Sequence, residues 1–223
     1  RSGTWQHFAM DVALLVYPGL TMLDAIGPYT VFGQTPGWDV QLVAAAPGLL
    51  RDDLTRVTLD VERTLADTPH PDVVVVPGGF VTRAMAQDPQ SAEVAWLRAV
   101  YPSATWVASV CTGSLLLGAA GLLGGLTAST HWGAVADLES YGATYVTERV
   151  VVHPDRRIVT AAGVSSGIDM ALTLVGAAVD PMVAQAIQLG IEYDPQPPYD
   201  AGSPTKAPAD VVELVRGAMA QRS

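Results

Sequence analysis

Short apolar, β-branched runs alternate along the chain with longer segments of helical spacing. The clearest strand covers residues 72–76, where four consecutive valines end at Pro77-Gly78-Gly79. An unbroken apolar run of this length is typical of a strand that is buried on both faces of a parallel sheet. The same reasoning predicts further strands at residues 10–17, 38–46, 57–61, 105–110, 144–146, 150–153 and 157–160.

Helical spacing fills most of the intervals between these strands. Residues 115–120 are apolar on every side, so this helix must lie inside the fold. Residues 194–208 contain five prolines and are expected to be extended. The other predicted helices are residues 23–32, 90–100, 131–141, 168–179, 181–191 and 211–219.

Alternating strands and helices predict an α/β fold, with a mostly parallel sheet and helices on both faces. We find no internal repeat and no long linker, so residues 10–223 are expected to form one domain. Residues 1–9 lack the basic-then-apolar layout of a secretion signal and are expected to be a flexible extension.

Charge and cysteine content narrow the possible functions. The formal net charge of −10 disfavours a nucleic-acid surface, which needs clustered Lys and Arg, and fits a small-molecule substrate. One cysteine cannot form an internal disulfide, so a reducing, cytoplasmic compartment is expected. Residues 99–136 carry no Asp, Glu, Lys or Arg, but Pro, Ser, Thr and Gly interrupt the run, so a buried strand–turn–helix is expected rather than a membrane span.

The single cysteine, Cys111, lies between a predicted buried strand and a predicted buried helix. The local sequence Ser109-Val110-Cys111-Thr112-Gly113-Ser114 has the layout of a nucleophile elbow, in which a sharp turn presents the nucleophile beside free backbone N–H groups. The positive end of the following helix favours a thiolate and predicts a lowered pKa for Cys111. The alternative is an inert cysteine in the core, where free cysteines are common.

Two other strand-following segments are expected at the same edge of the sheet. Gly78 and Gly79 allow backbone N–H groups to approach a ligand, and with the Thr112 N–H they could form an oxyanion site; the alternative is an ordinary turn. Asp24 is flanked by apolar residues, which favours a protonated acid that can donate a proton. It could equally well cap its own helix.

The histidines give weaker signals. His131 could orient or deprotonate the thiol, although a structural role is slightly favoured. His7, His70 and His153 show no spacing that indicates a metal site. Asp169 is expected to be a satisfied structural carboxylate near a helix start.

Taken together, these motifs resemble the DJ-1/PfpI superfamily, and within it the isocyanide hydratase branch. The resemblance spans residues 10 to about 219. It is carried by Tyr17-Pro18-Gly19, Leu23-Asp24, Gly27-Pro28, Val76-Pro77-Gly78-Gly79, the Cys111 segment, Ala119-Ala120-Gly121-Leu122-Leu123, Thr130-His131-Trp132, Gly167-Ile168-Asp169 and Pro197-Pro198-Tyr199-Asp200-Ala201-Gly202-Ser203-Pro204. The last segment is the most specific to the branch.

The resemblance implies a flavodoxin-like (class I glutamine amidotransferase-like) sandwich that forms a homodimer and uses no cofactor or metal. It also implies an Asp beside the cysteine where other members carry Glu, and Asp24 occupies that position. The implied reaction converts an isocyanide and water to an N-substituted formamide. Cys111 would attack the isocyanide carbon, protonated Asp24 would supply its hydrogen, and Thr112 and Gly79 would position the reacting atoms of a covalent thioimidate.

Three alternatives remain open. The same fold serves as the sensor half of AraC-like regulators, but no helix-turn-helix is expected in the four residues after Met219. A cysteine that is oxidised without turnover is the second alternative. Glyoxalase-like chemistry is the third; it would rely on His131 or on a Glu partner, and the Asp24 motif contains no Glu.

Overall fold

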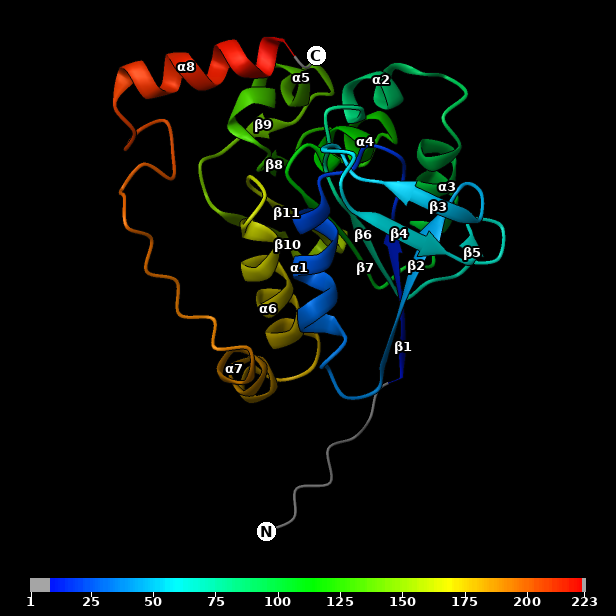
Figure 1. Ribbon diagram of the computed structural model, residues 1–223. Helices are drawn as coiled ribbons and strands as arrows, with labels where there is room; N and C mark the ends of the chain where they lie inside the picture. The colour runs from blue at the N-terminus through cyan, green and yellow to red at the C-terminus, as the bar shows by residue number, and fades with distance from the viewer. Residues whose placement is uncertain (1–8, 222–223) are drawn as a thin grey trace.

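The computed structural model describes residues 9–221, so the predicted extension at residues 1–9 lies, except for Ala9, outside the described residues (Figure 1). Seven strands form the central sheet, in the spatial order β10-β11-β7-β6-β1-β2-β5. Their bounds are β1 Met10–Leu15, β2 Trp38–Ala44, β5 Arg63–Thr64, β6 Val73–Val76, β7 Trp106–Val110, β10 Val150–His153 and β11 Ile158–Ala161.

All neighbouring strands of this sheet run parallel except β10, which pairs with β11 in the antiparallel sense. The parallel strands β2, β1, β6, β7 and β11 therefore follow the 2-1-3-4-5 order of flavodoxin-like folds. The four valines of β6 are 0% exposed, as their unbroken apolar run predicts. The predicted α/β class with a mostly parallel sheet is confirmed.

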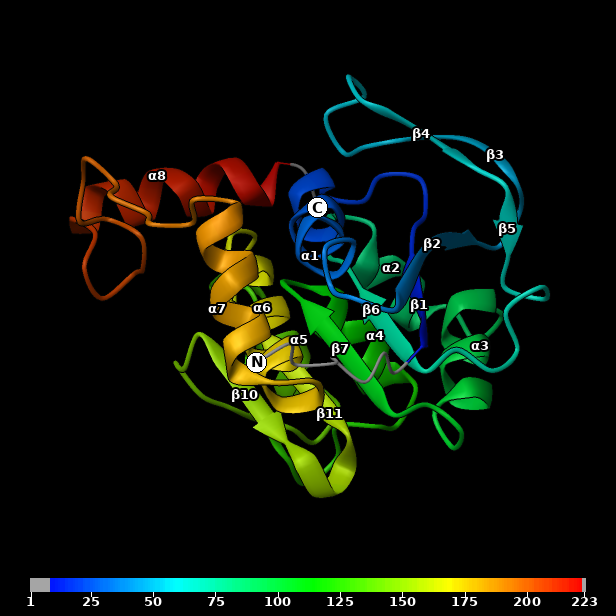
Figure 2. The same ribbon diagram turned by 90° about the horizontal axis from the view of Figure 1, so that it is seen from below.

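Helices cover both faces of the sheet (Figure 2). Helices α1 (Met22–Phe32) and α6 (Ser166–Ala178) pack against one another on one face, and α7 (Pro181–Gly190) packs on α6. Helices α3 (Ala92–Val100) and α4 (Gly113–Ala119) lie on the opposite face. Leu115, Leu116 and Leu117 of α4 are all buried, which confirms the prediction of a helix inside the fold.

A final helix lies apart from these layers. Residues 192–208 form no helix or strand, as their prolines predict, and lead to α8 (Ala209–Ala220). In Figure 1, α8 lies at the upper left, on the side toward which the parallel strands run. Arg216 of α8 lies 5.8 Å from the centre of the Trp132 ring, which precedes α5 (Val135–Ser140). None of the helices between residues 9 and 221 has both the length and the apolar character that crossing a membrane requires.

Several short elements differ from the predictions. The predicted strand at 57–61 is one arm of an antiparallel hairpin, β3 (Gly48–Arg51) with β4 (Thr58–Val61), which lies outside the main sheet. The predicted helix at 131–141 starts with a separate 3₁₀ turn, η1 (Trp132–Ala134), because the His131 ring accepts the Gly133 N–H and caps that turn. The remaining elements are α2 (Thr82–Gln87), η2 (Pro154–Arg156) and the strand pair β8 (Thr127–Ala128) with β9 (Thr144–Tyr145).

Candidate active site

Cys111 is the residue at which β7 ends and the chain turns into α4. Its φ of +57° lies in the left-handed region, which costs a non-glycine residue about 1 to 3 kcal/mol. The surrounding chain holds this conformation: the Cys111 N–H donates to the Ala162 carbonyl at 2.8 Å, and the Cys111 carbonyl accepts hydroxyl hydrogen bonds from Ser114 and Thr130 at 3.1 Å each. This strained turn has the geometry that the sequence predicted for an elbow.

The elbow fits against the end of β6 only because Gly113 has no side chain. A Cβ on Gly113 would lie 2.1 Å from the Val76 carbonyl oxygen. A Cβ on Gly78 would lie 2.7 Å from the Thr112 nitrogen and 2.8 Å from Asp24 Oδ2. The glycines of both turns therefore allow the strand ends and the α1 carboxylate to approach one another closely.

The Cys111 side chain is 5% exposed and faces a cavity of about 260 Å³. Burial is the largest influence on the thiol and raises its pKa, and the charge of Asp24 raises it further. The N–H groups of Thr112 and Val164 act in the opposite direction. The prediction of a lowered cysteine pKa was therefore wrong: α4 has only seven residues, and burial outweighs its positive end.

Asp24 lies in the first turn of α1 and is completely buried. Its Oδ2 accepts the Gly78 N–H at 2.8 Å, whereas Oδ1 has no hydrogen-bond partner among residues 9–221. The pKa of Asp24 is raised to about 7: burial raises it most, hydrogen bonds from Gly78 and Cys111 lower it, and the charge of Asp53 raises it. Since the carboxylate accepts no N–H from α1 in the described structure, the helix-capping interpretation does not hold.

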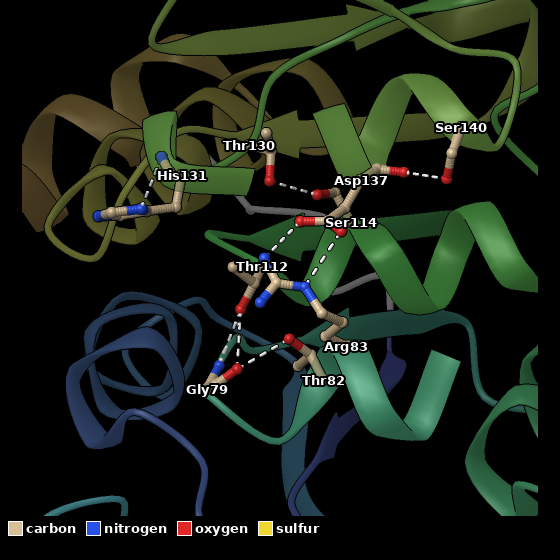
Figure 3. Close-up of polar contacts among 10 residues, drawn as sticks. Gly79, Thr82, Arg83, Thr112, Ser114, Thr130, His131, Asp137 and Ser140 are labelled. Carbon is tan, nitrogen blue, oxygen red and sulfur yellow. Dashed lines mark hydrogen bonds and ion pairs between the residues drawn. The ribbon is translucent and has the colours of Figure 1, made fainter. Parts of the chain in front are cut away.

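The turn after β6 uses its N–H groups within the protein. The Gly78 N–H binds Asp24, and the Gly79 N–H donates to Thr112 Oγ1 at 3.0 Å. The Thr112 hydroxyl also lies 3.1 Å from the Gly79 carbonyl, and Figure 3 shows both contacts. The prediction that Gly78 and Gly79 present free oxyanion donors therefore has to be corrected, because both groups position other residues of the site.

The N–H groups that do approach the cysteine sulfur belong to Thr112 and Val164. Val164 follows β11, and its N–H lies on a different strand end from the elbow itself. Sequence reasoning missed this residue, because nothing in a backbone N–H distinguishes Val164 from its neighbours before the fold is known.

His131 lies on the wall of the same cavity. Its Nδ1 accepts the Gly133 N–H at 3.1 Å, so the ring proton is on Nε2 (Figure 3). Burial lowers the pKa of His131, so the ring is neutral at physiological pH. Within residues 9–221, no hydrogen bond joins this ring to Cys111.

The remaining walls of the cavity are mostly apolar and come from distant segments. Helix α8 contributes Val215 and Met219, neither of which was predicted to lie near the cysteine. Besides Cys111, the lining residues are Thr21, Asp53, Gly79, Phe80, Thr82, Arg83, Thr112, Leu115, His131, Gly133, Ala134, Val164, Val215 and Met219. An apolar cavity with a few polar groups is typical of a small-molecule site.

Arg83 and Asp169 are both held in ion pairs within the protein. Arg83, on the cavity wall, forms a two-pronged ion pair with Asp137, with contacts of 3.0 and 2.6 Å. Asp169 pairs with Arg149 at 2.6 Å and accepts the Tyr193 hydroxyl, which confirms the prediction of a satisfied carboxylate. No three His, Cys, Asp or Glu side chains of residues 9–221 are grouped as a metal site would require.

The fold and the site together define a flavodoxin-like α/β protein with one strained cysteine at the carboxyl edge of its sheet. The profile of the DJ-1/PfpI family matches residues 10–177. The chain therefore belongs to the DJ-1/PfpI family, as its motifs indicated.

Individual relatives place the chain more closely within that family. It is 41% identical over 214 residues, covering 93% of this chain and 89% of the relative, to a Pseudomonas putida protein named isonitrile hydratase. It is 29% identical over 189 residues to the Pseudomonas aeruginosa HTH-type transcriptional regulator CdhR, covering 79% of this chain and 53% of that protein. A solved ThiJ/PfpI family protein from Pseudomonas syringae superposes with a TM-score of 0.90 at 36% identity, covering 97% of this chain and 88% of that one.

Proposed function

We propose that this protein is an isocyanide hydratase, which converts an isocyanide and water to an N-substituted formamide. The observation that carries the proposal is the buried Asp24 carboxyl group beside Cys111, with a pKa raised to about 7. The 41% identity with a protein named isonitrile hydratase supports the same activity, since isonitrile and isocyanide name one functional group.

The first proposed step forms a thioimidate. The terminal carbon of an isocyanide, R–NC, must receive both a nucleophile and a proton. The Cys111 sulfur attacks this carbon as its own proton passes to Asp24, and Asp24 delivers that proton to the same carbon. The product is R–N=CH–S–Cys111, with Asp24 left as a carboxylate.

The second proposed step consumes water. Asp24 accepts a proton from a water molecule as the oxygen adds to the thioimidate carbon, and the nitrogen then takes up that proton. The C–S bond breaks, the hydroxyl proton returns to the Asp24–Cys111 pair, and R–NH–CHO leaves. The sum is one isocyanide plus one water, which give one N-substituted formamide, and the Asp24–Cys111 pair ends with the proton with which it began.

The other residues of the site have supporting roles in this proposal. The N–H groups of Thr112 and Val164 stabilise negative charge on the sulfur as the C–S bond breaks. The Thr112 hydroxyl holds the turn that presents Gly78 to Asp24. The Nε2–H of His131 is placed to bind an acceptor atom on the substrate, and the apolar wall accepts the substituent R.

The alternatives receive less support from the site. A redox-sensing cysteine needs an accessible thiol of low pKa, whereas Cys111 is buried and burial raises its pKa. Glyoxalase-like chemistry that uses His131 as a base needs a hydrogen bond between the ring and the thiol, and none joins them within residues 9–221; the Nδ1 atom of the ring accepts the Gly133 N–H instead. The 29% identity with CdhR is a specific reason to retain a ligand-sensing role as a second candidate.

Turnover of an aryl isocyanide to its N-aryl formamide tests the proposal, with the parent compared against Cys111→Ala and Asp24→Asn. We expect activity in the parent and none in Cys111→Ala. The parent kcat/KM should rise with pH through about 7, as the pair loses its first proton, and this inflection should be absent from any residual activity of Asp24→Asn. An inactive parent, or a fully active Cys111→Ala, would reject the proposal.

We also propose that the protein is a cytoplasmic homodimer. Its single cysteine suits a reducing compartment. Large apolar side chains stand exposed on its last two helices, Met182 and Leu189 on α7 and Leu214 on α8, and burial against a second copy would remove them from water. Light scattering coupled to size exclusion measures the mass directly, and a monomer at micromolar concentration would contradict the dimer.

A further inference from the structure

Tyr17 is a buried side chain of the site to which the proposed reaction assigns no role. It follows β1, is 1% exposed, and its hydroxyl donates a hydrogen bond to the carbonyl oxygen of Pro77. Burial is the largest influence on its pKa and raises it well above the usual value, as do the charges of Asp24, Cys111 and Glu93. The phenol is therefore a neutral hydrogen-bond donor at any pH at which the protein works.

The acceptor of this hydrogen bond belongs to the peptide group that holds Asp24. The Pro77 carbonyl and the Gly78 N–H are two ends of one peptide unit, and that N–H donates to Asp24 Oδ2 at 2.8 Å. The residues that the structure describes contain no cis peptide bond, so the carbonyl and the N–H of this unit point in opposite directions. Tyr17, the peptide unit and Asp24 form a continuous hydrogen-bonded chain.

Hydrogen bonds in such a chain strengthen one another. Donation to a carbonyl oxygen draws electron density from the amide nitrogen, so the N–H at the other end becomes a stronger donor, by roughly 10 to 30% per bond. A stronger donor stabilises the ionised carboxylate more than the neutral acid. The Tyr17 hydroxyl also fixes the peptide plane, which keeps the N–H directed at Asp24.

We propose that Tyr17 is a positioning residue for the proton-transfer step, which acts through the Pro77–Gly78 peptide unit to set how readily Asp24 releases its proton. The catalytic meaning of this inference rests on the proposed function, because Asp24 carries the proton there. The chemistry of the contact does not depend on any particular substrate.

Other groups that face Asp24 act in known directions and stay in place when Tyr17 is changed. Cys111 lowers the pKa of Asp24, and the charge of Asp53 raises it. Arg83 and His131 line the adjoining cavity, where Arg83 is paired with Asp137 and His131 is neutral. The effect of the Tyr17 hydroxyl can therefore be measured against a constant background.

The turn itself does not depend on Tyr17 alone. The Gly78 carbonyl accepts the Thr21 N–H at 2.8 Å, and Gly79 is bonded to the Thr112 hydroxyl at both its N–H and its carbonyl. A Tyr17→Phe variant keeps the buried ring and loses only the hydroxyl. We expect it to fold, with the peptide unit still present but less strongly polarised.

The test is the rate at which iodoacetamide alkylates Cys111 as a function of pH, because this is the single cysteine of the chain. In the parent, the rate should change slope where Asp24 ionises, near pH 7. In Tyr17→Phe the inflection should move upward by about 0.5 of a pH unit, since one unit corresponds to only about 1.4 kcal/mol of differential interaction. Above the inflection the variant should react about threefold faster, because a more basic Asp24 leaves more of the shared proton off the sulfur.

Two controls separate this mechanism from a loosened site. Below the inflection both proteins should react at the same rate, whereas a more open site would react faster at every pH. In an Asp24→Asn background, Tyr17→Phe should have no effect. Tyr101→Phe removes a hydroxyl bonded to Arg156 at the amino ends of β7 and β11, the edge of the sheet opposite to Cys111, and should leave the profile of the parent unchanged. An unshifted inflection in Tyr17→Phe, or a shift that persists without the Asp24 carboxylate, would overturn the inference. Neither result depends on whether isocyanides are turned over.

Discussion

Asp24 and Cys111 shift each other's pKa in opposite directions: the thiol lowers the pKa of the carboxyl group, and the carboxylate charge raises that of the thiol. This is expected when one proton is shared between a thiol and a carboxylate. Whichever of the two groups holds the proton, the pair carries a single negative charge. The pair therefore holds, before a substrate arrives, the one proton that the proposed reaction delivers to carbon.

The burial of Asp24 should make the protein less stable as the pH rises. A carboxyl group with a folded-state pKa near 7, against 3.8 in the unfolded chain, stabilises the fold fully below pH 3.8 and loses that contribution between pH 3.8 and 7. Asp24→Asn removes this ionisation and keeps an acceptor for Gly78. We expect the variant to exceed the parent in free energy of unfolding by about 1 to 3 kcal/mol at pH 8.

Urea unfolding at pH 4.5, 6 and 8 measures this difference. The gain should shrink as the pH falls, because the parent carboxyl then keeps its proton in the folded state and avoids the cost of a buried charge. A difference between parent and Asp24→Asn that is the same at all three pH values would show that Asp24 does not titrate in this range.

The Thr112 hydroxyl should support both the fold and the reaction. Thr112→Val leaves the Gly79 N–H without its acceptor, which costs about 1 to 3 kcal/mol when the donor is buried. We expect the kcat of Thr112→Val to fall about tenfold, which corresponds to about 1.4 kcal/mol of lost alignment. Thr112→Ser retains the hydroxyl and should recover most of both losses; a serine variant as impaired as the valine variant would contradict the role of the hydrogen bonds.

Val215 on α8 should limit the size of the substrate. Its side chain lines the cavity of about 260 Å³, and Val215→Trp would fill part of that space. We expect the KM for a naphthyl isocyanide to rise about tenfold, equivalent to about 1.4 kcal/mol, with little change for methyl isocyanide. The neighbouring Leu214 is 73% exposed and does not line the cavity, so Leu214→Trp is the matched control. Equal effects of the two tryptophans would argue against α8 as a wall of the site.

Gly113 should tolerate no side chain. An alanine Cβ would lie 2.1 Å from the backbone oxygen of Val76, which cannot move aside, so Gly113→Ala should lower the free energy of unfolding by about 1 to 3 kcal/mol. Gly217→Ala on α8 meets no atom within 4 Å and should be neutral or stabilising by about 0.5 to 1 kcal/mol. Thermal unfolding compares the two, and a stable Gly113→Ala would show that β6 and the elbow can separate.

The meeting of Asp24, Gly78 and Cys111 could be predicted from the sequence. Each residue follows a strand that the apolar pattern identifies, and the carboxyl ends of parallel strands share one edge of a sheet. The pKa of Cys111 could not be predicted, because a local argument sees only the helix that follows, whereas burial by distant segments decides the outcome.

The residues that form the far wall of the cavity could not be predicted from the sequence either. The sequence predicts a helix at residues 211–219, but not the part of the fold against which it lies. Val215 and Met219 reach the site only because residues 192–208 carry α8 back to the edge of the cavity. Val164 contributes through its backbone, to which the residue type gives no clue.

The separation of α8 from the layered sandwich has a consequence for how such a protein can diversify. The cysteine, its carboxylate and their glycine turns are interlocked at close range with the sheet, so most substitutions there are costly. The outer wall of the cavity is formed by α8, a helix with no fully buried residue, which is joined to the rest of the protein by the extended residues 192–208. Natural selection can therefore alter the substrate preference through substitutions in α8, while the cysteine, its carboxylate and their glycine turns stay unchanged.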